Sequence, residues 1–390
     1  MNFDEIINRR GTHSAKWDLM EQIYGVPADE GISMWVADMD FRPPACVQDA
    51  LNGMLDHGIY GYFGDDTAYN AAIGWWMKNR HGWQIEDSWI FTTHGLVNGT
   101  ALCVDAFTDA GDGVVLFTPV YHAFAKVIKA ADRQVVECQL VNNDGRYEMD
   151  FAAYDTQMTG NEKMLILCSP HNPGGRVWTR DELQGVADFA KRHDLILVSD
   201  EIHHDLILSD TKHTVMALVD ETITDRLVMM TATTKTFNIA GSHTGNVIIP
   251  DPDLRAKFAG TMAALGLSPN SFGLVMTTAA YSQSGADWVD ELCVYISENC
   301  RIFNEGINAI SGLKSMPLEA TYLAWVDFSD TGMKPEEYRN RVEKIAKIAA
   351  NHGETFGTGG EDYLRFNLAT PRALVEEAVD RLQKAFADLQ

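Results

Sequence analysis

Short apolar runs that alternate with helical patterns constrain the fold of this chain more than any other feature. They occupy residues 114–117, 134–140, 164–168, 195–199, 227–231 and 246–249. Because the runs are apolar at successive positions, they are typical of strands buried on both faces. The helical patterns between them indicate a mostly parallel sheet. The sequence therefore predicts an α/β protein whose sheet is covered by helices on both faces.

One of the intervening helices has a clear start. Thr179 and Glu182 have the Thr-x-x-Glu spacing in which the hydroxyl and the carboxylate satisfy free N–H groups at a helix N-terminus. Apolar residues follow at helical spacing at positions 183, 186 and 189. We therefore expect a helix that packs on the predicted sheet.

The pattern changes after about residue 283, where long amphipathic helices surround two probable strands at 322–328 and 363–367. This change predicts two joined domains. The large domain is expected to span residues 46–283. The small α+β domain is expected to comprise residues 1–45 and 284–390.

Composition narrows the classes of partner and compartment. The 31 basic and 55 acidic residues give a net charge of −24, which disfavours nucleic acid and anionic membranes as partners. The six cysteines form no C-x-x-C pair, a pattern typical of reduced thiols in a cytoplasmic protein. The N-terminal residues resemble no export signal, and no segment is long and apolar enough to cross a membrane. We therefore expect a cytoplasmic protein with a small-molecule substrate.

Three polar motifs follow successive predicted strands. Asn172 lies in the segment Ser169-Pro170-His171-Asn172-Pro173-Gly174-Gly175-Arg176, Asp200 ends the next apolar run, and Lys235 follows the run at 227–231. Ligands of open parallel sheets bind at the carboxyl ends of the strands. An amide, a carboxylate and an amine are therefore expected to meet at one edge.

Each motif taken alone has a simpler interpretation. The first could be a turn, the acid could belong to a helix start, and the lysine could be exposed. His203, His204 and Asp205 could suggest a metal site, but adjacent residues of one short element point in different directions. No metal is therefore predicted.

The order Asn172, Asp200, Lys235 resembles that of fold-type I pyridoxal-5′-phosphate (PLP) enzymes. Nearly the whole chain resembles the MalY/PatB-like cystathionine β-lyases, or cysteine-S-conjugate β-lyases, of the class I/II aminotransferase superfamily. The segments Arg10-Gly11-Thr12, Lys16-Trp17-Asp18 and Trp35-Val36-Ala37-Asp38-Met39-Asp40-Phe41 carry the resemblance near the N-terminus. Tyr60-Gly61-Tyr62, Pro119-Val120-Tyr121-His122 and Tyr363-Leu364-Arg365-Phe366-Asn367 follow in family order.

The resemblance implies a role for each residue that faces the cofactor ring. Lys235 would form the Schiff base and shuttle the Cα proton. Asp200 would keep the pyridine nitrogen protonated, with His203 near or behind it, and Asn172 would donate to the phenolic oxygen. Tyr121 would stack on the ring.

The resemblance also implies the residues that bind phosphate and substrate. Backbone N–H groups of Gly95, Leu96 and Val97 and the hydroxyl of Thr234 would hold the phosphate. Tyr62 would reach the same group from the other subunit of a homodimer. The substrate would contact Arg365, Ala37 and Asn172, with Arg365 binding the α-carboxylate bidentately.

Three positions depart from the pattern of the family. His94 stands where relatives usually have proline, and Ala232 stands where they often have serine. His243 replaces a lysine or arginine that serves as the fixed cation on the phosphate. A histidine is charged only in part near neutrality. We therefore predict weaker PLP retention than in relatives.

The leading functional hypothesis is β-elimination from cystathionine or a related cysteine S-conjugate, which yields a thiol, pyruvate and ammonia. Aminotransfer is the first alternative, because both reactions need the same residues. A PLP-binding regulatory protein that acts by contacting another protein is a second alternative. The sequence alone leaves the physiological thioether open.

Overall fold

The computed structural model describes residues 1–208 and 210–389 and confirms the predicted α/β class. Its centre is a seven-stranded sheet with the strand order β2-β10-β9-β8-β7-β3-β4, in which β10 runs antiparallel to both of its neighbours. The strands are β2 (Ile90–Thr93), β3 (Gly113–Thr118), β4 (Gln134–Gln139), β7 (Glu162–Cys168), β8 (Ile196–Asp200), β9 (Leu227–Thr231) and β10 (Gly245–Ile248).

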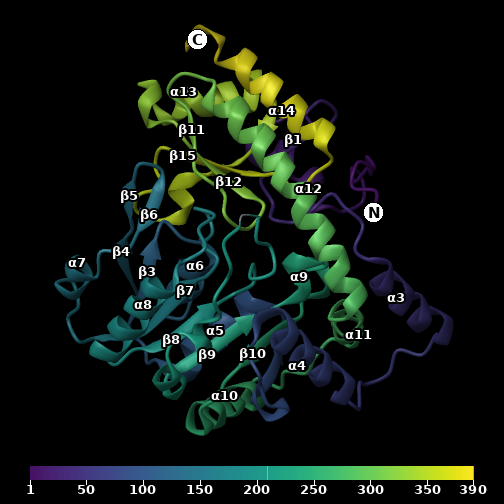
Figure 1. The fold of residues 1–390 in the computed structure, drawn as a ribbon, viewed down its shortest axis with the longest axis vertical. Coiled ribbons are helices and arrows are strands. Elements are labelled where there is room, and N and C mark those ends of the chain that lie inside the picture. Colours follow the sequence, from purple (N-terminus) through teal and green to yellow (C-terminus); the bar gives the residue numbers. More distant parts are fainter. Residues whose placement is uncertain (209, 390) are drawn as a thin grey trace.

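The sheet is apolar on both faces, as the unbroken runs of the sequence predict. In β3, Val114 and Leu116 pack into one core cluster, whereas Val115 and Phe117 pack into the other. Helices α5, α6 and α10 cover the first face, and α4 and α8 cover the second (Figure 1). The sheet is thus the middle layer of three.

One helix that covers the sheet begins with the signal that the sequence predicts, because Thr179 and Glu182 form the capping box of α8. The helices of this part of the chain are α3 (Ala45–His57), α4 (Thr67–His81), α5 (Leu96–Phe107), α6 (Ala123–Ala130), α7 (Phe151–Asp155), α8 (Arg180–Arg192), α9 (Thr233–Thr236), α10 (Pro252–Ala264) and α11 (Ser271–Ala280). A hairpin of β5 (Val141–Asn143) and β6 (Arg146–Glu148) lies beside them.

The C-terminal part forms a second sheet with its own helices, drawn in green and yellow above the large sheet in Figure 1. Its four-stranded antiparallel sheet has the order β11-β12-β15-β14. The elements are α12 (Gln283–Asn308), β11 (Lys314–Ser315), β12 (Leu323–Asp327), α13 (Pro335–Asn340), β13 (Ile348–Ala349), β14 (Asn351–His352), β15 (Tyr363–Asn367) and α14 (Arg372–Ala385).

The N-terminal segment packs against this C-terminal part. It contains two short helices, α1 (Ala15–Asp18) and α2 (Met20–Tyr24), and the strand β1 (Ile32–Ser33), which pairs with β13 in parallel. The division at residues 45/46 and 283/284 stays a prediction. The six cysteines are free. No helix of residues 1–208 and 210–389 combines the length and apolarity needed to cross a membrane.

Candidate active site

The three polar motifs meet at one edge of the large sheet. Strands β7, β8 and β9 are neighbours and run parallel, so their carboxyl ends lie together. Asp200 is the last residue of β8, Lys235 lies in α9 just after β9, and Asn172 lies in the loop that follows β7. The topology therefore brings the amide, the carboxylate and the amine into one cavity.

This cavity has a volume of about 250 Å³. The predicted site residues that line it are Ala37, Gly95, Leu96, Val97, Tyr121, Asn172, Asp200, His203, Thr234, Lys235 and His243. Arg365 adjoins it through Asn172. Tyr62 is fully exposed in the single chain, so its predicted contact with a partner's site stays a prediction.

Lys235 points at the main chain of the segment that crosses the cavity. Its Nζ donates to the carbonyl oxygen of Ala37 at 2.7 Å, and Tyr322 Oη donates to the same oxygen at 2.9 Å. Burial lowers the pKa of Lys235 to about 8, against the opposing effect of Asp38. A useful fraction of the amine is therefore neutral near physiological pH, as a nucleophile or base requires.

Asn residues fix the position of Ala37. Asn367 Nδ2 donates to the carbonyl oxygens of Val36 and Asp38, and the side chain of Asn238 bonds both the N–H and the carbonyl oxygen of Met39. The segment that faces Lys235 is thus held from both sides of the cavity.

Asp200 is buried beside the amine. Burial raises the pKa of its carboxyl to about 7, although Ile202 N donates to Oδ1 at 3.1 Å. His203 is also buried, and burial holds its pKa well below the usual value, so the ring is neutral. A carboxylate that is so poorly solvated favours a bound base with which it can share a proton.

The opposite end of the cavity is formed by the start of α5. Gly95, with φ of 84°, adopts a left-handed conformation that disfavours other residues, and the structure describes no side-chain cap on the free N–H groups of the first turn. Thr234 and His243 line the same cavity. His94 also lines it, and its Nε2 lies 2.8 Å from the carbonyl oxygen of Ser268. This end is suited to an anion.

Arg365, on β15, is buried without a carboxylate partner among the described residues. Its Nη1 donates to Asn172 Oδ1 at 3.0 Å and its Nη2 to the carbonyl oxygen of Trp35 at 2.9 Å, whereas Nε has no partner in that part of the chain. Burial lowers the pKa of this guanidinium to about 10. A buried cation with a free donor is a receptor for an anionic group.

Several residues at the site were not predicted. Cys168, Ile202 and Ala240 line the cavity, and Tyr322 and Asn238 position Ala37. Cys168 and Ile202 flank the predicted motifs, so their proximity was a usable signal. Tyr322 and Asn238 reach the site through long-range contacts that no local pattern encodes.

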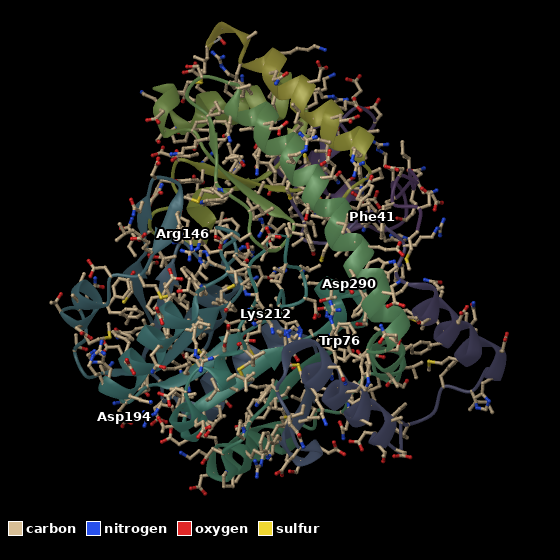
Figure 2. The ribbon with its side chains drawn as sticks, in the orientation of Figure 1. Phe41, Trp76, Arg146, Asp194, Lys212 and Asp290 are labelled. Atoms are coloured by element: carbon tan, nitrogen blue, oxygen red, sulfur yellow. The ribbon has the colours of Figure 1, made fainter. Side chains whose placement is uncertain are left out.

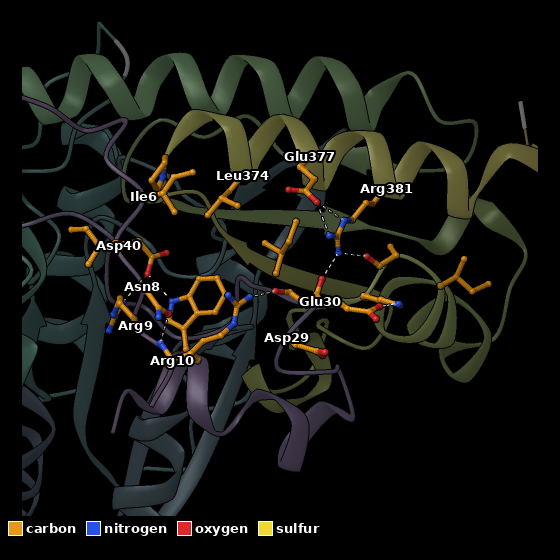
Figure 3. A pocket seen from close by; sticks show the side chains of 18 residues that line it. Ile6, Asn8, Arg9, Arg10, Asp29, Glu30, Asp40, Leu374, Glu377 and Arg381 are labelled. Atoms are coloured by element: carbon orange, nitrogen blue, oxygen red, sulfur yellow. Dashed lines mark hydrogen bonds and ion pairs between the residues drawn. The ribbon is translucent and has the colours of Figure 1, made fainter. Parts of the chain in front are cut away.

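A larger cavity, of about 820 Å³, lies away from these groups, between the N-terminal segment and α14 (Figure 3). Its basic residues already have partners. Arg381 pairs with Glu377, and Arg10 Nε donates to the carbonyl oxygen of Ala28. Lys235 and Asp200 do not line it, so size alone does not identify the active site.

Comparisons with known proteins identify the family of the chain. The family described as aminotransferase class I and II matches residues 35–382. Cystathionine β-lyase PatB of Bacillus subtilis is 38% identical over 99% of this chain and 100% of PatB, and protein MalY of Escherichia coli is 30% identical over 98% of each. A structure of cystalysin from Treponema denticola, which contains a PLP cofactor, is 38% identical and has a TM-score of 0.95 over 100% of this chain and 99% of cystalysin.

The match to the family spans most of the chain, and the two curated relatives span nearly all of it. The likeness to cystalysin extends this agreement to the fold. The chain therefore belongs to the class I and II aminotransferase family, in the branch that contains PatB and MalY.

Proposed function

We propose that this protein is a PLP-dependent carbon–sulfur β-lyase that acts on L-cystathionine or a related L-cysteine S-conjugate. The observation that carries the proposal is the presence of two buried groups at one site. Lys235 is an amine with a lowered pKa, and Arg365 is a cation that has no carboxylate partner among the described residues. The first group suits proton transfer at Cα, and the second suits the α-carboxylate of an amino acid. The names of PatB and cystalysin support the choice of substrate class.

The residues of the cavity fit PLP. The uncapped start of α5 with Thr234 offers donors to a phosphate, and Asp200 offers a carboxylate to a ring nitrogen. Lys235 and Asn172 line the same cavity as these groups. Phosphate, ring nitrogen and aldehyde therefore each have a matching group. Lys235 would hold the aldehyde carbon, Asp200 the ring nitrogen, and Asn172 the phenolic oxygen.

When bound, PLP supplies an electron sink that stabilises negative charge at Cα of the amino acid. Arg365 binds the α-carboxylate and so orients the Cα–H bond. Lys235 Nζ takes the Cα proton, and Tyr121 covers one face of the site. The Cβ–S bond then breaks with its electron pair on sulfur, which leaves as a thiolate. Addition of water to the remaining three-carbon fragment yields pyruvate and ammonia.

Aminotransfer is the competing activity, because the family as a whole is described by it. It uses the same proton transfer from Cα to Lys235. The two reactions differ in whether the Cβ–S bond breaks before a proton is added to the aldehyde carbon of the cofactor. The products therefore distinguish β-elimination from aminotransfer.

PLP-loaded protein is expected to convert L-cystathionine to pyruvate and free thiol in equal amounts, with no need for an α-keto acid. Lactate dehydrogenase coupling measures the pyruvate, and a thiol reagent measures the second product. A parallel reaction contains 2-oxoglutarate. Glutamate formation without thiol release would replace the lyase assignment by aminotransferase.

We infer a homodimer in the cytoplasm. The exposed segment after α3 carries Ile59, Tyr60, Tyr62 and Phe63, an unusual cluster of exposed apolar side chains that supports an interface. Tyr62 would reach the partner's phosphate end from this segment. The free cysteines support a reducing compartment. Sedimentation equilibrium would give the mass of one chain if the dimer were wrong.

The His243→Lys variant is expected to hold PLP about tenfold more tightly at pH 8, because a permanent cation contributes about 1.5–3 kcal/mol to a charged hydrogen bond. Cofactor release on dilution, followed by absorbance, measures the effect. The exposed His57→Lys serves as a control for net charge. Unchanged or weaker PLP binding in His243→Lys would contradict a role of this position at the phosphate.

A further inference from the structure

A second group of titratable side chains lies behind the active site, on the other side of the turn that follows β8. His81 ends α4, Glu201, His204 and Asp205 belong to the turn, and His213 lies in the loop beyond it. His203 lines the cofactor cavity, whereas its neighbour His204 belongs to this group. Three of these residues, Glu201, His204 and Asp205, lie within five positions of the sequence. The fold adds the other two.

The side chains of the group form two overlapping triads, each compact enough to hold an ion. The potential ligand atoms of His81, His204 and Asp205 all lie within 4.8 Å of one another, and so do those of Glu201, His204 and His213. His204 belongs to both triads. The rings of His81 and His204 stack with centroids 4.1 Å apart, and the ring of His213 lies 6.1–6.2 Å from both.

Among the described residues, the buried ring of His204 has an ion pair with Asp205 but no well-aligned hydrogen bond. Its side chain is fully buried, and neither ring nitrogen has a hydrogen-bond partner among the described residues, although Nε2 lies 3.2 Å from Asp205 Oδ2. A buried polar group without a hydrogen bond costs roughly 1–3 kcal/mol and needs a physical explanation. The ring faces two carboxylates and two further imidazoles, which together form a set of ligands.

The two carboxylates are hydrogen-bonded within the group and by residues around it. His81 Nε2 lies 2.9 Å from Asp205 Oδ1, and His213 Nε2 lies 2.8 Å from Glu201 Oε2. Asp205 accepts from Trp76 Nε1 and Thr236 Oγ1, each at 3.0 Å. Glu201 accepts from Ser199 Oγ at 3.0 Å and from Met216 N at 2.9 Å. Such outer hydrogen bonds orient the ligands of protein metal sites.

A separate cavity of about 390 Å³ connects this group to the surface. Lys212, Asp290 and Cys293 line it together with His81, His204 and His213. Figure 2 labels Trp76, Lys212 and Asp290 around this region, between α4 and α12. Arg80 also lines the cavity, but its guanidinium pairs with Asp290 at 2.7 Å. An ion could therefore enter without crossing the cofactor cavity.

We propose that His81, His204 and His213, with Glu201 and Asp205, form a binding site for Zn²⁺. Imidazoles and carboxylates are ligands that this ion prefers. Each triad offers two imidazoles and one carboxylate, three of the four ligands of a tetrahedral site, and His204 is common to both triads. The site is independent of the proposed lyase activity. It lies next to the active site, because Glu201 and His204 adjoin Asp200 and His203 in sequence, and Asp205 contacts Thr236 beside Lys235.

The test uses tag-free holoenzyme, stripped with a chelator and equilibrated with ZnCl₂. Plasma mass spectrometry after gel filtration gives the zinc content, and competition with a chromogenic chelator gives the affinity. We expect one zinc ion per chain, bound at least about tenfold more weakly in His204→Gln and His213→Gln, in line with the loss from altering a metal site. The exposed His57→Gln is the matched control and should bind zinc as the unaltered protein does.

Two further measurements keep the result interpretable. Co²⁺ in place of Zn²⁺ should give the intense visible absorption of a four-coordinate site, which both variants should lose. Circular dichroism establishes that each variant is folded, and His213→Gln, nearer the surface, serves if His204→Gln does not fold. Two outcomes would overturn the proposal. If the holoenzyme takes up no zinc, the group is explained instead by His204 as a buried imidazolium between two carboxylates. If both folded variants bind zinc unchanged, the ion binds elsewhere.

Discussion

Replacing Lys235 with alanine is expected to lower the rate of β-elimination by at least about 10⁴-fold, the upper end of what one positioned acid–base group contributes. The expectation follows from the place of Lys235 Nζ, which is buried, has a pKa of about 8 and lies 2.7 Å from the carbonyl oxygen of Ala37. No other lysine lines the cavity in the described part of the chain. Pyruvate release from L-cystathionine, measured at saturating PLP, gives the ratio of kcat values.

A specific readout separates chemistry from folding. Small primary amines added to Lys235→Ala should restore part of the activity in proportion to their concentration, because they can replace the missing base. The exposed Lys129→Ala should behave as the unaltered protein does. An activity above about one hundredth of the original in Lys235→Ala, without added amine, would assign the proton transfer to another group.

Much of the fold could be predicted because the large sheet is apolar on both faces. Unbroken apolar runs located β3, β7 and β9 to within two residues, and the polar residues after β7, β8 and β9 indicated one shared edge. The strand β2 was missed, because its four residues include two threonines and show no continuous apolar pattern. The short helices α1 and α2 were missed because each covers at most five residues.

The site was predictable where a motif carries its own chemistry and was not where the chemistry depends on distant partners. Asp200 and Lys235 stand out in the sequence because Asp200 ends an apolar strand and Lys235 follows one closely. The hydrogen bonds that hold Ala37 come from Asn238, Asn367 and Tyr322, which are far away along the chain. The group of His81, Glu201, His204, Asp205 and His213 behind β8 likewise depends on contacts between residues that are far apart in the sequence. The sequence argument that adjacent residues point apart is wrong for His204 and Asp205, which lie in one triad, and His81 and His213 complete a cluster that local reasoning could not find.

Arg365→Met is expected to lower kcat/KM for L-cystathionine by about 10²–10³-fold, since loss of a buried charged partner costs roughly 2–5 kcal/mol. The stability of the fold should decrease much less than kcat/KM. Methionine keeps most of the volume, and removing a cation whose pKa burial has lowered to about 10 offsets the donors lost by Asn172 and Trp35. We therefore expect the free energy of unfolding to change by less than about 2 kcal/mol.

An analogue that lacks the α-carboxylate tests the contact directly, because it removes the other half of the same interaction. Binding is measured through the absorbance change of the bound cofactor. The unaltered protein should prefer the substrate to this analogue by about the factor that Arg365→Met loses, whereas the variant should bind the two almost equally. Additive losses would mean that the carboxylate and Arg365 do not interact. A buried cation without an acidic partner in the described chain would then need another explanation than substrate recognition.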